Sequence, residues 1–317
     1  MNFGIDEQQR DFAASIDAAL GAADLPAAVR SWADGDTAPG RKVWAQLADL
    51  GVTALMVPEK FDGIDAHPVD LVVALERLGR WCVPGPVTES IAVAPVLLGA
   101  DERCAALAAG ELIATVAQPP LVPRAVDADT AGLILLAEDG TVREATASDS
   151  CESVDPSRRL FTVGAAGDSR PAETGLAFEF GALATAAQLV GAAQGMLDAA
   201  VAYAKQRSQF GTVIGTYQAI KHKLADVLIA VELARPLVYG AALALADRAP
   251  ETARDVSAAK VAAADAALLS ARSALQTHGA IGFTAEHDLS LQLLRVQALR
   301  PAWGDPTWHR RRVLEAL

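Results

Sequence analysis

The sequence has few aromatic residues and few cysteines, and each scarcity excludes a class of protein. Phe, Trp and Tyr together make up 5% of the 317 residues, whereas 52% are hydrophobic. Such a composition, dominated by alanine, is typical of closely packed helices and not of a sandwich of bulky β-forming residues. Cys82, Cys104 and Cys151 are unevenly placed and have no Cys-x-x-Cys spacing. They predict reduced thiols of a cytoplasmic protein and not a disulfide framework.

Positive charge and long hydrophobic runs are also scarce. The chain has 27 Lys and Arg against 39 Asp and Glu, which gives a net charge of −12. The only run of three Lys or Arg residues in the sequence is 310–312. Because the chain is acidic overall, we do not expect nucleic-acid binding as a main task. No unbroken hydrophobic stretch reaches membrane-spanning length, and no basic segment precedes a hydrophobic core at the N-terminus. We therefore expect neither a membrane span nor a signal peptide.

The first third of the chain is predicted to be helical. Phe12, Ile16 and Leu20 recur every four residues, which places them on one face of a helix over residues 5–22. Similar patterns predict further helices over residues 42–50, 68–78 and 88–98. We assign residues 1–113 to an N-terminal helical domain.

Between residues 114 and 176 the pattern changes to short β-type segments. Four runs are rich in strand-forming residues, at 114–118, 133–137, 141–145 and 160–163. Asp139-Gly140 lies between two of these runs and predicts a hairpin. A small β domain of four to six strands is therefore expected here.

The rest of the chain, residues 177–317, is predicted to form a four-helix bundle. Four segments rich in Ala, Leu and Val alternate with short loops, at residues 183–206, 217–246, 251–277 and 286–299. Their lengths suit antiparallel neighbours joined by short connections. The expected fold class is mainly α with a small β domain.

The loop that joins the first two bundle helices has an unusual composition. Gly211 and Gly215 interrupt the helical pattern, and Arg207, Phe210 and Tyr217 stand around them. The loop is more apolar than a solvated connection needs to be. We expect it to be buried against another chain or a ligand.

Three stretches, in this order along the chain, carry a resemblance to a known family. They are Val57-Pro58-Glu59-x-Phe61-x-Gly63 with Leu75-Glu76-x-Leu78-Gly79-Arg80, then Arg207-x-x-Phe210-Gly211 with Tyr217-Gln218-Ala219-Ile220, and finally Gln276-Thr277-His278-Gly279-Ala280-Ile281-Gly282-Phe283. The sequence resembles the flavin-dependent acyl-CoA dehydrogenases. The resemblance implies an acyl-CoA dehydrogenase-like fold, FAD as cofactor and an acyl-CoA thioester as substrate.

The resemblance also implies which residues bind FAD. Arg207 would hold the pyrophosphate, because a guanidinium supplies positive charge and fixed donors. Gln209, Phe210, Tyr217 and Gln218 would make flanking contacts. The alternative for Arg207 is a helix-terminal arginine that satisfies backbone carbonyl groups.

A second stretch would close over the adenosine diphosphate half of the flavin. Its members are Gln276, Thr277, His278, Gly279 and Ala280. A glycine lets backbone N–H groups approach phosphate oxygens, and Gly279 can serve as a helix C-cap at the same time. The family usually has two glycines here, and Ala280 replaces one of them. His278 and His287 have no third ligand at metal-binding spacing, so no metal site is expected.

The catalytic base is not fixed by the resemblance. Abstraction of the α-proton of an acyl thioester needs a carboxylate, which the family supplies at one of two positions. In this chain the C-terminal position falls on Trp303, Gly304 or Asp305, and the other falls near Gly181, two residues after Glu179. Asp305 and Glu179 are the candidates here, although each could be a solvated turn acid. In that alternative a Glu of a partner subunit would be the base, and Trp303 and Trp308, which flank Asp305, would fill the cavity that a substrate would occupy.

The β region departs from the family pattern. Full-length members carry Thr-x-x-x-x-Gly-Ser-Asp and Trp-Ile-Thr stretches that hold the flavin ring, and neither is present in this sequence. The chain thus resembles the short subunit of heteromeric (α2β2) acyl-CoA dehydrogenases of actinobacterial steroid catabolism, in which unlike subunits share a flavin. A full-length partner subunit is expected. The alternatives are a non-catalytic scaffolding subunit and a self-sufficient homo-oligomeric dehydrogenase.

Overall fold

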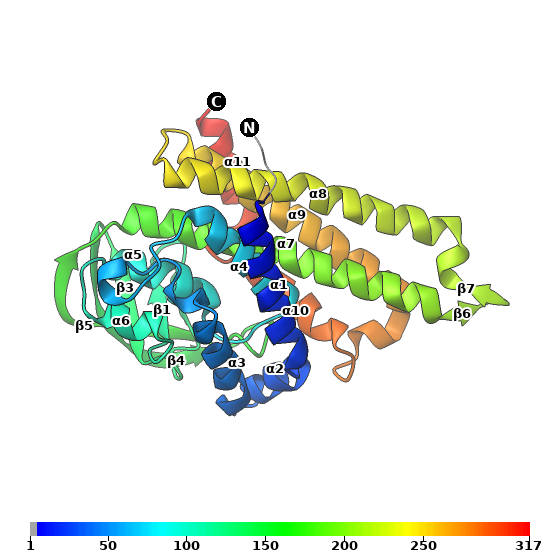
Figure 1. Ribbon diagram of the computed structural model, residues 1–317, viewed down its shortest axis with the longest axis horizontal. Helices are drawn as coiled ribbons and strands as arrows, with labels where there is room; N and C mark the ends of the chain where they lie inside the picture. Colours follow the sequence, from blue (N-terminus) through cyan, green and yellow to red (C-terminus); the bar gives the residue numbers. More distant parts are fainter. Residues whose placement is uncertain (1–4) are drawn as a thin grey trace.

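The computed structural model describes residues 5–317. The first four residues, which belong to the N-terminal stretch without a predicted signal peptide, lie outside the described residues. The N-terminal helices and a small sheet lie on one side, and three long helices extend away from them across the molecule (Figure 1). The expected class, mainly α with a small β region, is confirmed.

Six short α-helices make up the N-terminal part. They are α1 (Glu7–Ala22), α2 (Leu25–Ala33), α3 (Ala38–Asp49), α4 (Pro68–Arg80), α5 (Ala94–Leu98) and α6 (Arg103–Ala108). Asp6 and Gln9 form a capping box at the start of α1, which satisfies two backbone donors. The sequence analysis missed α2, although Asp24 caps it. The helix expected over 88–98 is a π-helical segment, η3 (Thr88–Val93), followed by α5.

The β region is one five-stranded sheet in the order β1-β3-β4-β5-β2. Its strands are β1 (Ala114–Ala117), β2 (Ala125–Val126), β3 (Leu133–Glu138), β4 (Thr141–Cys151) and β5 (Leu160–Pro171). The predicted hairpin at Asp139-Gly140 is confirmed, since β3 and β4 pair antiparallel on either side of it. Both turn residues have positive φ, 45° and 76°, as a type I′ turn requires.

The helical bundle follows the sheet. It consists of α7 (Thr174–Gln206), α8 (Gln218–Ala246), α9 (Thr252–His278) and α10 (Leu289–Leu299). The four predicted bundle helices are confirmed, although α7 begins nine residues before residue 183. A further helix, α11 (Pro306–Glu315), was not predicted. Many alanines of α9 are buried against its neighbours, as expected of tightly packed helices.

Helix α4 crosses α7 at a very short distance, which fixes the N-terminal part on the bundle. A Cβ built at Gly79 of α4 would overlap the backbone of Gln188, and one at Gly191 of α7 would overlap the backbone of Glu76. Only glycine leaves room for this crossing. The Leu75-Glu76-x-Leu78-Gly79 stretch is therefore a packing motif.

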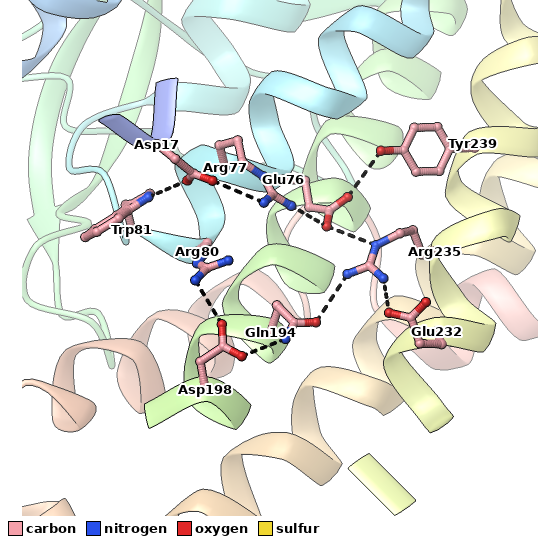
Figure 2. A network of polar contacts seen from close by, with 10 residues as sticks. All are labelled: Asp17, Glu76, Arg77, Arg80, Trp81, Gln194, Asp198, Glu232, Arg235 and Tyr239. Carbon is pink, nitrogen blue, oxygen red and sulfur yellow. Dashed lines mark hydrogen bonds and ion pairs between the residues drawn. The ribbon is translucent and has the colours of Figure 1, made fainter. Parts of the chain in front are cut away.

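A polar network beside this crossing ties α4 to both α7 and α8 (Figure 2). The buried carboxylate of Glu76 accepts hydrogen bonds from Arg77 (2.7 Å), Arg235 of α8 (3.0 Å) and the Tyr239 hydroxyl (3.4 Å). Arg235 also donates to the side-chain oxygen of Gln194 on α7 (3.3 Å). Since a buried carboxylate left without its cation is strongly unfavourable, these contacts hold the three helices in one arrangement.

Two of the bundle helices are hydrophobic over a membrane-spanning length, although their hydrophobic stretches are interrupted by polar residues. Helices α7 and α8 each contain an 18-residue window that is long and apolar enough to cross a membrane, by length and composition only. In α7, 94% of that window is buried inside the protein, so its composition is that of a core helix. In α8 only 39% is buried. One face of α8 is therefore apolar and not covered by the described part of the chain.

Candidate functional site

The loop between α7 and α8 is a small hairpin at the far end of the bundle (Figure 1). Strand β6 (Ser208–Gln209) pairs antiparallel with β7 (Thr212–Val213), and Phe210 and Gly211 form the turn. Both turn residues have positive φ, 54° and 82°. An aromatic residue in this conformation is strained by roughly 1–2 kcal/mol, and 93% of the Phe210 side chain is exposed. Strain and exposure together point to a role outside this chain.

The other predicted residues of the first stretch surround this turn. Arg207 is the C-cap of α7 and is exposed, and its guanidinium has no hydrogen-bond or ion-pair partner within residues 5–317. The Tyr217 hydroxyl donates to the Gln209 carbonyl (3.2 Å), which closes the hairpin. The Gln218 amide contacts the His222 ring nitrogen at 3.0 Å. The Arg207 side chain thus satisfies no carbonyl group within residues 5–317, although the residue itself caps α7 and places its charge at the negative end of the helix dipole.

The second predicted stretch lies at the C-terminal end of α9 and divides into exposed and buried members. Gln276, Gly279 and Ala280 are exposed, whereas Thr277 and His278 are buried. Thr277 Oγ1 donates to a carbonyl of its own helix (2.8 Å), and His278 Nδ1 lies 2.8 Å from the carbonyl of Ala274. Burial lowers the pKa of His278, which keeps its ring neutral.

The fold brings the two predicted stretches together. The His278 ring stacks on Tyr203 of α7, with ring centroids 4.4 Å apart. Lys223, in the second turn of α8, donates to the side-chain oxygen of Gln276. We call the surface formed by residues 206–218 and 276–283 the open end of the bundle.

The open end fits the diphosphate half of a flavin. Arg207 supplies a positive charge on the surface that no residue of the described part of the chain pairs with, as an anion site needs. Gly279 has φ 70°, and a Cβ built there or at Gly211 would meet no heavy atom within 4 Å. The backbone of both glycines is therefore open to a ligand. Phe283 is 70% exposed and adds apolar surface.

The opposite end of α7 is closed by a tryptophan. Trp303 is 1% exposed and has a positive φ of 56°. Its ring lies directly against Gly181, so that a Cβ at Gly181 would overlap ring atoms. Trp303 is one of the three residues on which the C-terminal base position can fall, and Gly181 lies at the alternative position. The fold brings these two residues into contact, and neither of them is an acid.

A buried glutamate holds the tryptophan in place. The indole Nε1 of Trp303 donates to Oε1 of Glu89 in η3 (3.0 Å). Glu89 is buried, and its Oε2 has no hydrogen-bond partner within residues 5–317. Glu89 could not be predicted, because nothing in the sequence around it distinguishes it from an ordinary helical acid. We call Gly181, Trp303 and Glu89, with the residues packed around them, the sealed end.

The two candidate bases of this chain make structural contacts. Glu179 is paired with Arg312 of α11. Asp305 is the N-cap of α11 and accepts from the N–H groups of Thr307 (2.7 Å) and Trp308 (3.1 Å). Although burial opposes it, these hydrogen bonds lower the pKa of Asp305. Asp305 has extended backbone, as expected before a proline, but it starts a helix and does not stand on a free turn.

A lysine fixes the loop that carries Trp303. Lys260 of α9 is fully buried, and its Nζ donates to the carbonyls of Leu299 (3.3 Å), Arg300 (2.8 Å) and Gly304 (3.4 Å). Burial, with the nearby charge of Arg300, lowers the pKa of Lys260 to about 7.

Within residues 5–317 no group of three or more His, Cys, Asp or Glu could hold a metal ion.

Comparisons with known proteins match both helical parts of the chain. Residues 6–105 match the family model of the acyl-CoA dehydrogenase N-terminal domain, and residues 174–317 match that of the acyl-CoA dehydrogenase C-terminal domain. The intervening residues, which include the sheet, match neither model.

Relatives and solved structures agree with these models. The chain is 32% identical to the acyl-CoA dehydrogenase IpdE2 of Mycolicibacterium smegmatis, over 91% of this chain and 92% of the relative. The fold is similar to the ChsE4-ChsE5 complex from Mycobacterium tuberculosis (TM-score 0.85, 21% identity, 99% and 98% coverage). It is also similar to the Tcur3481-Tcur3483 steroid ACAD (TM-score 0.84, 20% identity, 98% and 97% coverage). The chain belongs to the acyl-CoA dehydrogenases, a family of oxidoreductases whose cofactor is FAD.

Proposed function

We propose that this chain is one subunit of a heteromeric acyl-CoA dehydrogenase that introduces an α,β double bond into an acyl-CoA thioester. A full-length partner subunit supplies the flavin-ring pocket and the base, and this chain supplies the open end. The contrast between the two ends of α7 carries the proposal. Arg207 is exposed and has no side-chain partner within residues 5–317, whereas the buried ring of Trp303 packs against Gly181 at the end where an acid is missing.

In this proposal the residues of the open end bind the cofactor of the partner. FAD, when bound, supplies the hydride acceptor for the desaturation. Arg207 donates to its pyrophosphate, and the amides of Gln209, Gln218 and Gln276 supply further donors. The phosphates approach the backbone at Gly279 and Ala280, where Gly279 has no side chain in the way; its own N–H already donates to the Leu275 carbonyl. Thr277 and His278 act indirectly, since their side chains are buried and orient the end of α9.

The apolar face of α8 is proposed to meet the partner subunit. Leu228, Ile229, Leu233 and Leu237 are each between 45% and 67% exposed. A continuous apolar stripe of this size on one helix is typical of a protein interface. The stripe lies on α8, which begins directly after the hairpin, so one partner subunit can cover both the stripe and the open end. The free thiols of all three cysteines agree with the cytoplasmic location that is part of this proposal.

The similar structures indicate which kind of acyl group to test first. One of them is named as a steroid ACAD and another as a two-protein complex. We therefore propose a steroid-derived acyl-CoA as the substrate and an α2β2 heterotetramer as the assembly.

Flavin content per chain tests the proposal. The chain is expressed alone and together with its partner, and the flavin absorbance of each product is measured. We expect almost no flavin in the chain alone and one flavin for each pair of unlike chains. Stoichiometric flavin in the chain alone would establish a self-sufficient enzyme. If the partner alone binds FAD as tightly as the complex does, this chain is a scaffold.

A further inference from the structure

Three aromatic rings stack at the C-terminal end of α9. The His278 ring packs face to face on Tyr203 of α7, with ring centroids 4.4 Å apart and ring planes 28° apart. His287 completes the stack, since its ring centroid lies 5.1 Å from that of His278 in a T-shaped arrangement. His278 is buried, whereas Tyr203 and His287 are half-buried. We call these three residues the ring stack, which joins α7, the end of α9 and the loop before α10.

The central ring, His278, has a fixed orientation. Its Nδ1 donates to the carbonyl of Ala274 (2.8 Å), because a carbonyl oxygen can only accept. Burial lowers the pKa of His278, so the ring is neutral and carries its proton on Nδ1. A neutral ring packs on Tyr203 without burying a charge. The ring stack is therefore held by packing and by one hydrogen bond to its own helix.

The backbone of η5 (Gly279–Phe283) wraps closely around His278. A Cβ built at Gly282 would lie 2.9 Å from the Cβ of His278 and 3.0 Å from the side chain of Leu289. Both distances are shorter than ordinary side-chain contacts, so this approach needs a glycine. Gly279, the first residue of η5, has φ 70° and ψ −152°, a conformation that essentially only glycine adopts. A shift of the His278 ring would therefore move this backbone.

The other end of the loop is held by His287. Its Nδ1 accepts from the backbone N–H of Leu289 in the first turn of α10 (3.1 Å), which satisfies one of the open donors of that helix. Since His287 also contacts His278, the ring stack holds the loop at both ends. The loop includes Gly279 and Ala280, which the proposed function places at the cofactor phosphates.

Tyr203 links this loop to the first predicted stretch. It lies one turn before Arg207, whose backbone N–H donates to the Tyr203 carbonyl (2.9 Å). Its ring packs on His278 of the second predicted stretch, so a single residue contacts both stretches of the open end. The Tyr203 hydroxyl has no hydrogen-bond partner within residues 5–317, so the contact is made by the face of the ring.

We propose that Tyr203 is a positioning residue for the cofactor in the heteromeric enzyme. Its ring holds His278, and His278 holds the backbone at Gly279, where the phosphates bind. Tyr203 itself touches neither the cofactor nor the substrate, and it lies outside both predicted stretches. This inference rests on the proposed function, because it requires that the open end binds the FAD of the partner subunit.

Two variants of Tyr203 in the heteromeric complex test the proposal. Tyr203→Leu removes the ring face, so fluorescence titration of the apo complex should give an FAD dissociation constant about three- to tenfold higher. Tyr203→Phe keeps the ring face, so its constant should stay within about twofold of the wild type. At saturating FAD both variants should turn over within about twofold of the wild type, since Tyr203 touches no reacting atom. Equal constants for Tyr203→Leu and the wild type, or for Tyr203→Leu and Tyr203→Phe, would overturn the proposal.

Hydrogen exchange of the chain without flavin separates positioning from a general loss of structure. In Tyr203→Leu the amides of residues 279–284 should exchange about three- to tenfold faster, whereas those at the α4–α7 crossing should not change. Unchanged exchange in η5 would show that the ring does not hold the loop. Faster exchange over the whole chain would show that the ring only stabilises the fold. Either result contradicts a positioning role.

His287→Asn is an independent variant that remains decisive if Tyr203→Leu does not fold. Asparagine keeps an acceptor for the Leu289 N–H but removes the outer ring, so the FAD dissociation constant should rise about two- to fivefold. If this constant does not rise while Arg207→Ala weakens FAD binding, the inference fails and the proposed function stands. If Arg207→Ala also leaves FAD binding unchanged, the open end does not bind the cofactor and both fail.

Discussion

The two ends of helix α7 are built in opposite ways. At its C-terminal end the chain exposes an arginine that has no side-chain partner among residues 5–317 and a strained, solvated phenylalanine. At its N-terminal end a buried tryptophan packs against a glycine and donates to a buried glutamate. Under the proposed function, this difference means that the chain keeps a surface for the partner's cofactor at one end of α7 and has no base at the other.

The largest effect is expected at the sealed end. Trp303→Ala should lower the free energy of unfolding by about 3–5 kcal/mol, because it leaves a cavity beside Gly181 and removes the donor to Glu89. Urea unfolding followed by circular dichroism measures the change. Trp308→Ala, at a half-buried tryptophan five residues away, is the control and should cost less. A loss below about 1 kcal/mol for Trp303→Ala would mean that the ring does not close this end.

At the open end the effect is on the cofactor and not on folding. Arg207→Ala should weaken FAD retention in the heteromeric complex by about ten- to a hundredfold, since one charge-assisted contact contributes roughly 1.5–3 kcal/mol. Fluorescence titration of the apo complex with FAD gives the dissociation constant. Lys205→Ala removes the same charge two residues earlier and should have little effect. Equal constants for Arg207→Ala and the wild type would remove Arg207 from the cofactor site.

The pH dependence of stability tests Lys260, which holds the loop of the sealed end. Its pKa is about 7 in the folded state against 10.5 for an ordinary lysine. Between these values the unfolded state binds more protons, so stability rises with pH. From pH 7 to 9 the wild type should gain about 2 kcal/mol relative to Lys260→Met. Urea unfolding at both pH values measures this difference. A parallel pH profile for the two proteins would show that Lys260 remains charged when buried.

The smallest effect is expected for the two candidate bases. Glu179→Gln and Asp305→Asn should leave turnover of the complex within about threefold of the wild type, whereas loss of a true general base costs about 10²–10⁴. Asn caps a helix as well as Asp does, so the start of α11 should persist. Steady-state assays at matched flavin content decide the point. A more than hundredfold loss for either variant would place the base on this chain.

Much of the architecture could be predicted because it is recorded in local patterns. Hydrophobic periodicity predicted α1, α4 and the four bundle helices, and Asp139-Gly140 predicted its hairpin. The same reasoning missed α2 and α11, although Asp24 and Asp305 stand at their N-caps. In α11 the pre-proline aspartate was interpreted as a turn residue, since a sequence pattern does not show whether a helix follows a cap.

The sequence by itself determined the family, because the stretches that carry the resemblance are contiguous and their residue types are specific; the same stretches supply the residues that we propose for the cofactor. Only the tertiary structure decided which of them face solvent: Gln276 is exposed, whereas the next residue, Thr277, is buried. It also decided the sealed end, where Glu89, Gly181 and Trp303 come from three distant segments. The physical reason is that burial and the pairing of charges depend on which segments pack together, and that packing is a property of the whole chain.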